Sequence, residues 1–198
     1  MITTFIFDIG NVVWEYKPLL DQLLHRYAAI TNLDYDNFYQ KYLEFYSLAE
    51  INQSTLNDFA LSFNQNPEVF WSALDEIYSP QFNDYLNQPL VNLIKDLKTL
   101  FKVGYLSNAE NFFYPYIHQR LDPLFDFGYT SWQLGLRKPD TPIYQVVLEK
   151  QQLSPSQVVF IDDTQKNLVA PQQLGLKTIL YQNNQQFLSD LSVLNPFI

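Results

Sequence analysis

The sequence predicts an α/β fold: a doubly wound, parallel, Rossmann-like sheet with an inserted cap of four helices. Short apolar runs alternate with helical patterns along most of the chain, as in a parallel sheet whose two faces are covered by helices. Between the first apolar run and the next, four amphipathic helical patterns follow one another without a strand. We therefore expect a core domain formed by residues 1–16 and 86–198, and a helical cap domain formed by residues 17–85.

The first strand is expected within Ile2 to Val13, ITTFIFDIGNVV, a segment that contains one carboxylate, Asp8. Its β-branched and aromatic residues are nearly continuous, which is typical of a strand buried on both faces, and Gly10 and Asn11 supply a turn directly after it. Asp8 is therefore expected at the carboxyl end of a central strand, the edge where open α/β sheets bind ligands. From this segment alone, an aspartate that only caps the turn is an equal alternative.

The expected cap lies between Pro18 and Asp84. Four windows there, residues 20–27, 35–42, 56–63 and 70–77, show apolar residues at the i, i+3, i+4, i+7 spacing of an amphipathic helix. Helix-start signals precede three of them, at Asp34, Ser54 and Pro67. The aromatic stripes along these windows are interpreted as hydrophobic core.

Helical and strand patterns alternate from Pro89 to the end of the chain. The expected strands are residues 102–106, 127–130, 158–161 and 177–181. A helix is expected before the first of these strands and after each of them, with a loop at 132–139 before the helix that Asp140 opens. Pro171 lies inside the pattern of the helix that stops at Gly175, so that helix is expected to start late or to kink.

The composition limits the classes of partner. With 198 residues, the chain fits one large domain or a core with an insertion, and no segment reaches the roughly 18 apolar residues of a membrane span. The net charge of −9, with only 12 scattered Lys and Arg residues, argues against binding to nucleic acid or to an anionic membrane.

There is no cysteine, and the start of the chain carries no signal-type segment, so a cytoplasmic location is expected. The oligomeric state is not indicated.

Polar residues follow the expected strands or lie in the loops between them, and the fold would gather them at one edge of the sheet. These residues are Asp8, Ser107, Asn108, Lys138, Asp162 and Asp163. Crowded carboxylates are costly unless neutralised, and an all-oxygen cluster suits a hard cation such as Mg²⁺, which in turn suits phosphate. Lys138 and Ser107 are candidates for binding phosphoryl oxygens, and Asp8 for attacking phosphorus to form an acyl phosphate. Asn108 is a candidate for substrate binding or for support of its loop.

Four segments, in order, resemble the four motifs of the haloacid dehalogenase-like superfamily. FIFDIGNVV is similar to the first motif, YLSNA to the second, GLRKPDTPIY to the third and VVFIDDTQKN to the fourth. The resemblance implies a Rossmann-like core with a helical cap, Asp8 as the nucleophile, and Ser107 and Lys138 as catalytic residues that bind the phosphoryl group. It also implies a Mg²⁺ site formed by Asp8, the Gly10 carbonyl, Asp162 and Asp163. Because dehalogenase members lack the paired acids, the resemblance implies a magnesium-dependent phosphatase of a small metabolite, with a sugar phosphate favoured.

Position 10 departs from the pattern of the family's phosphatases, which usually carry a second aspartate there as general acid and base. Gly10 offers a metal its carbonyl but has no side-chain proton to donate. The DxGNV form is similar to that of a bacterial subgroup that contains sugar-phosphate phosphatases, among them glucose-1-phosphate phosphatase. A non-catalytic module that binds a phosphorylated ligand is the alternative function. Glu15 and Tyr16 are expected either to line the cavity or to be linker residues. Asn167 is expected to orient Asp163, with an amide on the helix surface as the alternative.

Overall fold

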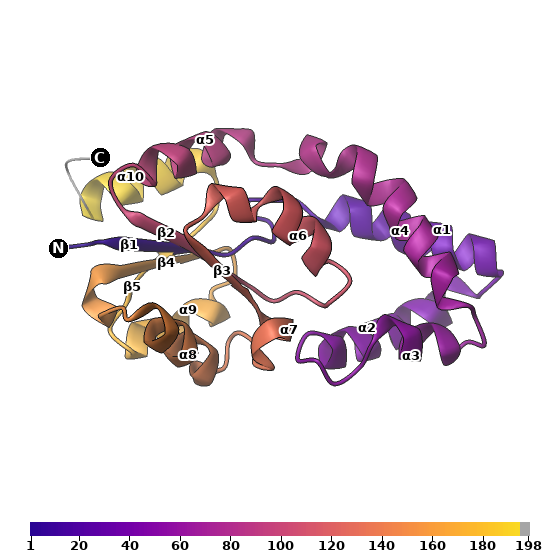
Figure 1. Cartoon of the computed structure of the whole chain (residues 1–198). Coiled ribbons are helices and arrows are strands. Elements are labelled where there is room, and N and C mark those ends of the chain that lie inside the picture. The colour runs from indigo at the N-terminus through magenta and orange to yellow at the C-terminus, as the bar shows by residue number, and fades with distance from the viewer. Residues whose placement is uncertain (195–198) are drawn as a thin grey trace.

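The core is a sheet of five parallel strands, seen edge-on at the left of Figure 1. The computed structural model describes residues 1–194. The strand order is β3-β2-β1-β4-β5, with β1 at Thr4–Phe7, β2 at Lys102–Ser107, β3 at Phe127–Thr130, β4 at Val158–Asp162 and β5 at Lys177–Leu180. Phe7 pairs with Tyr105 of β2 and with Ile161 of β4, so the carboxyl ends of these three strands are level. All five expected strands are present.

Helices cover both faces of the sheet, which confirms the doubly wound α/β class. Phe5 and Phe7 point into a core cluster with α5 (Gln88–Leu97), α6 (Tyr114–Arg120) and α10 (Asn184–Leu194). Ile6 points to the opposite face, into a second cluster with α8 (Thr141–Gln151) and α9 (Lys166–Gln173). This alternation explains why the apolar run of β1 is continuous, since both of its faces are buried. Short 3₁₀ helices are η1 (Phe82–Tyr85), η2 (Asp122–Leu124) and η3 (Pro155–Gln157).

One local expectation for the core is wrong, and so is one of the two alternatives given for the helix that contains Pro171, the late start; the kink there stays a prediction. The segment expected as a loop contains a short helix, α7 (Ser131–Leu134), because Thr130 and Gln133 form a reciprocal capping box and Gly135 ends the turn at φ 63°. Helix α9 does not start late at Pro171. A proline at this position leaves the carbonyl four residues earlier, that of Asn167, without its helical partner, and the Tyr144 hydroxyl donates a 2.7 Å hydrogen bond to it instead.

The four expected cap helices are α1 (Lys17–Thr31), α2 (Tyr35–Ala49), α3 (Leu56–Leu61) and α4 (Pro67–Gln81). Asp34 accepts a hydrogen bond from the Asn37 amide at the start of α2, and Pro67 opens α4, as expected. Ser54 is not the cap of α3: the next residue, Thr55, forms a capping box with Asp58. Figure 1 shows the four helices beyond the carboxyl ends of the strands.

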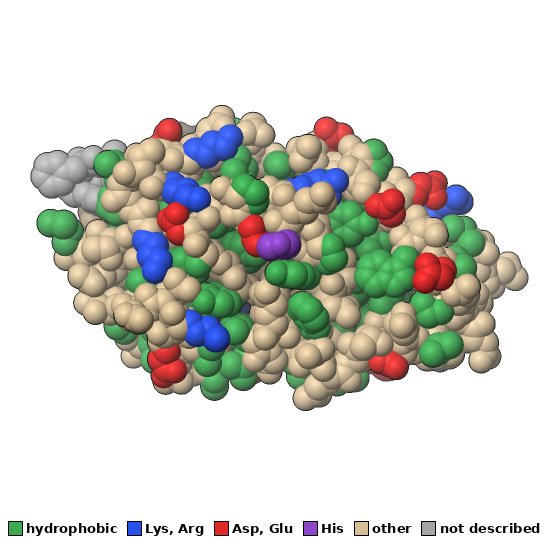
Figure 2. All heavy atoms as spheres, in the orientation of Figure 1, with side chains coloured by type: hydrophobic (Ala, Val, Ile, Leu, Met, Phe, Trp, Pro, Cys, Tyr) green, Lys and Arg blue, Asp and Glu red, His purple; other side chains and the backbone are tan. Residues whose placement is uncertain are grey.

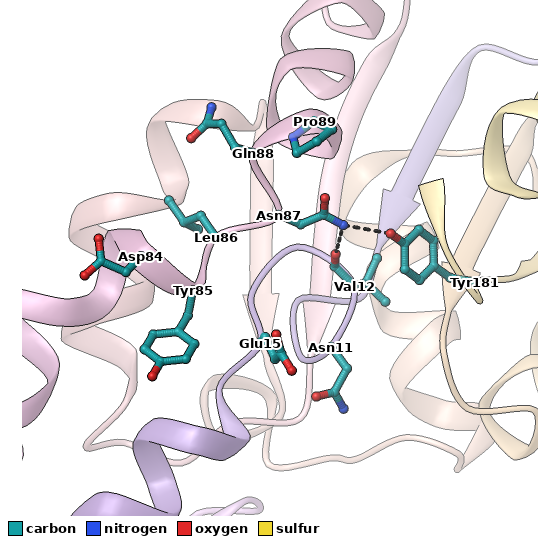
Figure 3. A pocket seen from close by; sticks show the side chains of 10 residues that line it. All are labelled: Asn11, Val12, Glu15, Asp84, Tyr85, Leu86, Asn87, Gln88, Pro89 and Tyr181. Carbon is teal, nitrogen blue, oxygen red and sulfur yellow. Dashed lines mark hydrogen bonds between the residues drawn. The ribbon is translucent and has the colours of Figure 1, made fainter. Parts of the chain in front are cut away.

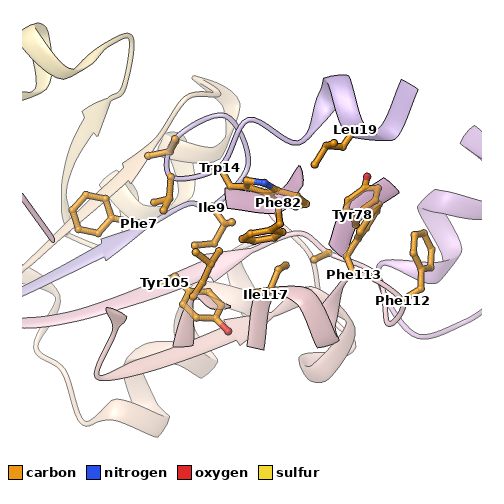
Figure 4. Close-up of a cluster of buried hydrophobic side chains, with 14 of the residues drawn as sticks. Phe7, Ile9, Trp14, Leu19, Tyr78, Phe82, Tyr105, Phe112, Phe113 and Ile117 are labelled. Atoms are coloured by element: carbon orange, nitrogen blue, oxygen red, sulfur yellow. The ribbon is translucent and has the colours of Figure 1, made fainter. Parts of the chain in front are cut away.

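Aromatic side chains join these helices to the sheet without a break (Figure 4). Trp14, on the segment that leaves β1, stacks on Phe82 at 4.4 Å between ring centroids, and Tyr78 of α4 lies 5.2 Å from Phe113 of the core. Phe112 likewise lies 5.7 Å from Phe70 of α4. The helical layer is therefore packed firmly over the carboxyl edge of the sheet. The domain boundaries at residues 16 and 86 remain a prediction.

Within residues 1–194, no helix combines the length and the apolar character that crossing a bilayer requires. On the face shown in Figure 2, the Lys and Arg side chains lie apart from one another, among polar and apolar side chains.

Candidate active site

Three of the expected site residues meet at the carboxyl edge of the sheet. Asp8 directly follows β1, and its amide donates to the Ile161 carbonyl of β4 at 2.8 Å, which holds it level with Asp162 at the end of that strand. Lys138 reaches between the two aspartates: its Nζ lies 2.9 Å from Asp8 Oδ1 and 2.7 Å from Asp162 Oδ2. All three side chains are buried. The sequence-based expectation that these residues converge is therefore met by the geometry.

The two neighbouring acids of the fourth motif have different surroundings. Asp162 is fully buried, and both of its oxygens are bonded: Asn167 Nδ2 donates at 3.0 and 3.1 Å, and the Thr164 amide at 2.8 Å. The expectation that Asn167 orients Asp163 is wrong. Asn167 lies in the first turn of α9, and its amide nitrogen donates to Asp162 instead. Asp163 is partly exposed and accepts two hydrogen bonds, from the Asn11 side chain and from the Thr164 hydroxyl, both at 3.2 Å.

The carboxylates of Asp8, Asp162 and Asp163 suit a hard metal ion. Each offers one oxygen, and the three oxygens lie within 4.8 Å of one another. Asn11, in the left-handed conformation at φ 55°, turns the chain so that the backbone of Gly10 faces the same region. No residue between 1 and 194 donates a hydrogen bond to the Gly10 carbonyl, which leaves that oxygen available. An all-oxygen donor set of this kind fits Mg²⁺.

Burial and charge act against each other at this site. Burial raises the pKa of Asp8 to about 7, while Lys138 opposes the shift. Burial alone would lower the pKa of Lys138, but Asp8 and Asp162 raise it above its usual value, so the ammonium group keeps its proton. Burial, followed by Glu110 and Asp8, raises the pKa of Tyr16 to about 12. One buried cation therefore lies between two buried carboxylates. When both carboxylates are ionised, one negative charge is left without a partner, so a further cation would be favourable.

Ser107 and Asn108 have different functions in the structure. Asn108 bonds the backbone of Lys138 twice, accepting from its amide at 2.9 Å and donating to its carbonyl at 3.0 Å. Asn108 thereby holds the loop that carries Lys138, which favours the supporting alternative over substrate binding. Ser107 ends β2, is buried, and lines the cavity above Asp8.

That cavity has a volume of about 230 Å³ and lies between the sheet edge and the helical layer. Its side chains from the helical layer include Tyr46 and Glu50, at the end of α2. Glu50 is almost completely buried, and the Arg137 guanidinium of the core lies 2.9 Å from its Oε2. Lys166, at the start of α9, completes the polar wall.

Sequence reasoning did not identify Glu50, Tyr46 and Lys166 as cavity residues. Tyr46 and Glu50 lie outside the four motif segments and reach the site through the packing of α2. Lys166 lies inside the VVFIDDTQKN segment, but the resemblance implied no function for it, and it reaches the cavity from the start of α9. The one signal present in the sequence is that Glu50 interrupts an otherwise apolar end of the α2 pattern.

Of the two residues left open after the first motif, Tyr16 lines this cavity and Glu15 does not. Glu15 is exposed and lines a separate cavity of about 460 Å³ (Figure 3). There Asn87 donates to the Val12 carbonyl at 2.9 Å and to the Tyr181 hydroxyl at 2.7 Å, which fixes the loop after Asp8.

Comparisons with known proteins agree with this fold. Over 206 aligned residues, the chain is 23% identical to D-ribitol-5-phosphate phosphatase from Bacteroides thetaiotaomicron, covering 98% of both. A 71-residue stretch is 38% identical to bifunctional epoxide hydrolase 2 from Sus scrofa, but this match spans only 36% of the present chain and 13% of that protein. A solved HAD family enzyme from Bacteroides thetaiotaomicron, in complex with magnesium and inorganic phosphate, superposes with a TM-score of 0.76 at 18% identity, covering 95% and 99% of the two chains.

The class of protein is thus a hydrolase built on a Rossmann-like core. More specifically, the chain belongs to the haloacid dehalogenase-like hydrolases, whose family model matches residues 2–175. The expectation of an enzyme of this family is confirmed. The phosphatase that it matches along its whole length supports the phosphatase branch, whereas the likeness to glucose-1-phosphate phosphatase stays a prediction.

Proposed function

We propose that the protein is a magnesium-dependent phosphomonoester hydrolase that acts on a small phosphorylated metabolite through an aspartyl-phosphate intermediate at Asp8. The observation that carries the proposal is the placement of Lys138 between Asp8 and Asp162, at 2.9 and 2.7 Å, beside a third carboxylate. A buried ammonium group and an acidic triad together suit the negative charge of a phosphoryl group and its metal ion.

Asp8 is arranged to act as the nucleophile. Its Oδ1 accepts hydrogen bonds from the Ile9 amide at 2.7 Å and from Lys138, whereas no residue between 1 and 194 donates to its Oδ2. Oδ2 would attack phosphorus, and water would then hydrolyse the acyl phosphate, which splits one difficult step into two easier ones. Lys138 and the Ser107 hydroxyl would hold the phosphoryl oxygens.

The metal would be held by Asp8, the Gly10 carbonyl and Asp163, with Asp162 as the nearest further carboxylate. When bound, Mg²⁺ would neutralise charge on the phosphoryl oxygens. Asp162 already bonds Lys138, Asn167 and the Thr164 amide, so its main function would be to hold Lys138 in place.

A sugar or polyol phosphate is the favoured substrate. The cavity of about 230 Å³ is small, and Tyr16, Tyr46, Glu50 and Arg137 offer hydrogen-bond partners to several hydroxyl groups. The full-length relative named above is a D-ribitol-5-phosphate phosphatase. We also propose a cytoplasmic location, since a chain without cysteine needs no oxidising compartment.

A panel of phosphorylated metabolites, assayed with Mg²⁺ and with excess chelator, tests the proposal. The purified protein should release phosphate from at least one sugar or polyol phosphate, and both chelation and Asp8→Asn should abolish the release. Asp36→Asn, on the exposed side of α2, is the matched control and should keep full activity. Binding of a phosphorylated ligand without release of phosphate would favour the alternative, a non-catalytic binding module.

A further inference from the structure

Tyr16 occupies the space in which a side chain at position 10 would lie. It is the residue before α1, and its ring lies against Gly10: a Cβ atom added to Gly10 would come within 3.0 Å of Tyr16 Cε1 and 3.3 Å of Cδ1. Gly10 does not have a positive φ, so the ring and not the backbone conformation crowds a side chain there. The Tyr16 ring therefore packs against Gly10, the residue that lies two positions after Asp8.

The Tyr16 hydroxyl is available to a ligand. Tyr16 lines the cavity that also contains Asp8, and its hydroxyl makes no hydrogen bond with any residue between 1 and 194. A tyrosine hydroxyl can both donate and accept a hydrogen bond. The site thus contains a proton donor with no partner of its own, close to the turn that carries Asp8.

The other candidate proton donors in the cavity already have partners. Glu50 is paired with Arg137 at 2.9 Å. Burial raises the pKa of Glu50, while a hydrogen bond from Tyr46 and the charge of Arg137 oppose that shift. The Tyr46 hydroxyl is thus engaged with Glu50, and Lys138 already bonds two carboxylates.

We propose that the Tyr16 hydroxyl donates the proton to the leaving oxygen of the substrate. This inference rests on the proposed function. As Asp8 Oδ2 forms its bond to phosphorus, the ester P–O bond breaks, and the leaving oxygen takes the Tyr16 proton and departs as an alcohol. The Tyr16 oxygen, now a phenolate, then takes a proton from the water that attacks the aspartyl phosphate. This step regenerates the tyrosine and the Asp8 carboxylate and releases inorganic phosphate.

The leaving-group dependence of the rate tests this assignment. Alkyl phosphates need a proton on the leaving oxygen, whereas 4-nitrophenyl phosphate does not. Tyr16→Phe should therefore lower kcat/KM for ribitol 5-phosphate and other alkyl phosphates by about 10²-fold or more, with a much smaller effect on 4-nitrophenyl phosphate. Tyr46→Phe removes a hydroxyl from the same cavity and is the matched control: any loss should be equal for the two ester classes.

A second pair of variants keeps the assignment falsifiable if the ring has a structural function as well. Tyr16→Ala should show the same selective loss, and Gly10→Asp combined with Tyr16→Ala should recover part of the rate on alkyl phosphates, because the carboxyl group then enters the vacated space. An equal loss on both ester classes for Tyr16→Phe, or no loss, would overturn the inference while leaving the proposed function intact. A natural protein that hydrolyses neither class would overturn both.

Discussion

Asp162 and Asp163 are neighbours in the sequence, but their contacts assign them different functions. Both oxygens of Asp162 are bonded by Lys138, Asn167 and the Thr164 amide, whereas Asp163 is partly exposed and bonded more weakly. The sequence alone could predict that both acids follow β4. It could not predict which of the two faces solvent, because that depends on how the loop turns into α9.

We therefore expect the two acids to respond differently to substitution. Asp163→Ala should raise the Mg²⁺ concentration that gives half-maximal activity by about tenfold or more, since the lost oxygen bears directly on the ion. Isothermal titration with Mg²⁺ should show the same weakening without substrate. Asp162→Ala should instead lower the melting temperature, because Lys138 loses a buried partner. Unchanged Mg²⁺ affinity in Asp163→Ala would exclude this residue as a ligand.

At the scale of elements, a buried ion pair is one of the contacts between the end of α2 and the core. Glu50 at the end of α2 is 2% exposed, and Arg137 of the core, about one-third exposed, lies 2.9 Å away. Asn52 nearby accepts a hydrogen bond from the Trp132 indole of α7 at 2.9 Å. Both contacts join the segment around the end of α2 to the core.

Arg137→Met should destabilise the protein, because it leaves the Glu50 carboxylate buried without its cation. The expected loss in free energy of unfolding is about 1–3 kcal/mol, measured by urea denaturation. Arg26→Met breaks an exposed pair with Glu76 in the helical layer and should change little. If Arg137→Met is as stable as Arg26→Met, the buried pair does not hold α2 to the core.

Glu110, directly after the second motif, makes stability depend on pH. It is fully buried, and burial raises its pKa well above the usual range. The folded protein therefore keeps a proton on Glu110 that the unfolded chain releases above about pH 4.5. Through this group, the free energy of unfolding falls as pH rises from that value to the raised pKa, by up to about 1.4 kcal/mol per pH unit.

Glu110→Gln should remove this contribution. Urea denaturation between about pH 5 and pH 8 should then show a shallower decline of stability with rising pH than in the natural protein. Glu149→Gln, on the exposed side of α8, should leave the decline unchanged. An equal decline in the natural protein and Glu110→Gln would show that Glu110 does not hold the proton.

The elements were predictable where a local pattern decides them. Asp8 and Asp162 were placed at strand ends because the apolar runs before them are continuous on both faces. Helix α7 was missed although Thr130 and Gln133 carry a capping-box signal, and Ser54 was preferred to Thr55 although Asp58 is the partner of Thr55. Glu50 could not be predicted as a site residue, because its burial results from tertiary packing alone.

At the scale of the whole molecule, the carboxyl edge of the sheet gathers the acidic site, and the helical layer covers it. The order β3-β2-β1-β4-β5 puts β1 in the centre, so that Asp8 lies between Ser107 of β2 and Asp162 of β4. The aromatic cluster around Trp14 and Phe82 holds the helices over that edge and leaves a small polar cavity above Asp8. Asp8, Lys138 and Asp162 are thereby buried at this edge, and the cavity beside Asp8 has a volume of about 230 Å³.

The central claim is that Asp8 becomes phosphorylated during turnover. The direct measurement is mass spectrometry of the protein quenched in acid while it hydrolyses a phosphate ester with Mg²⁺. The expected result is one phosphoryl group per chain, labile to hydroxylamine, on the peptide that contains Asp8, and none in Asp8→Asn. Steady turnover with no phosphorylated protein at any quench time, together with full activity of Asp8→Asn, would contradict the claim.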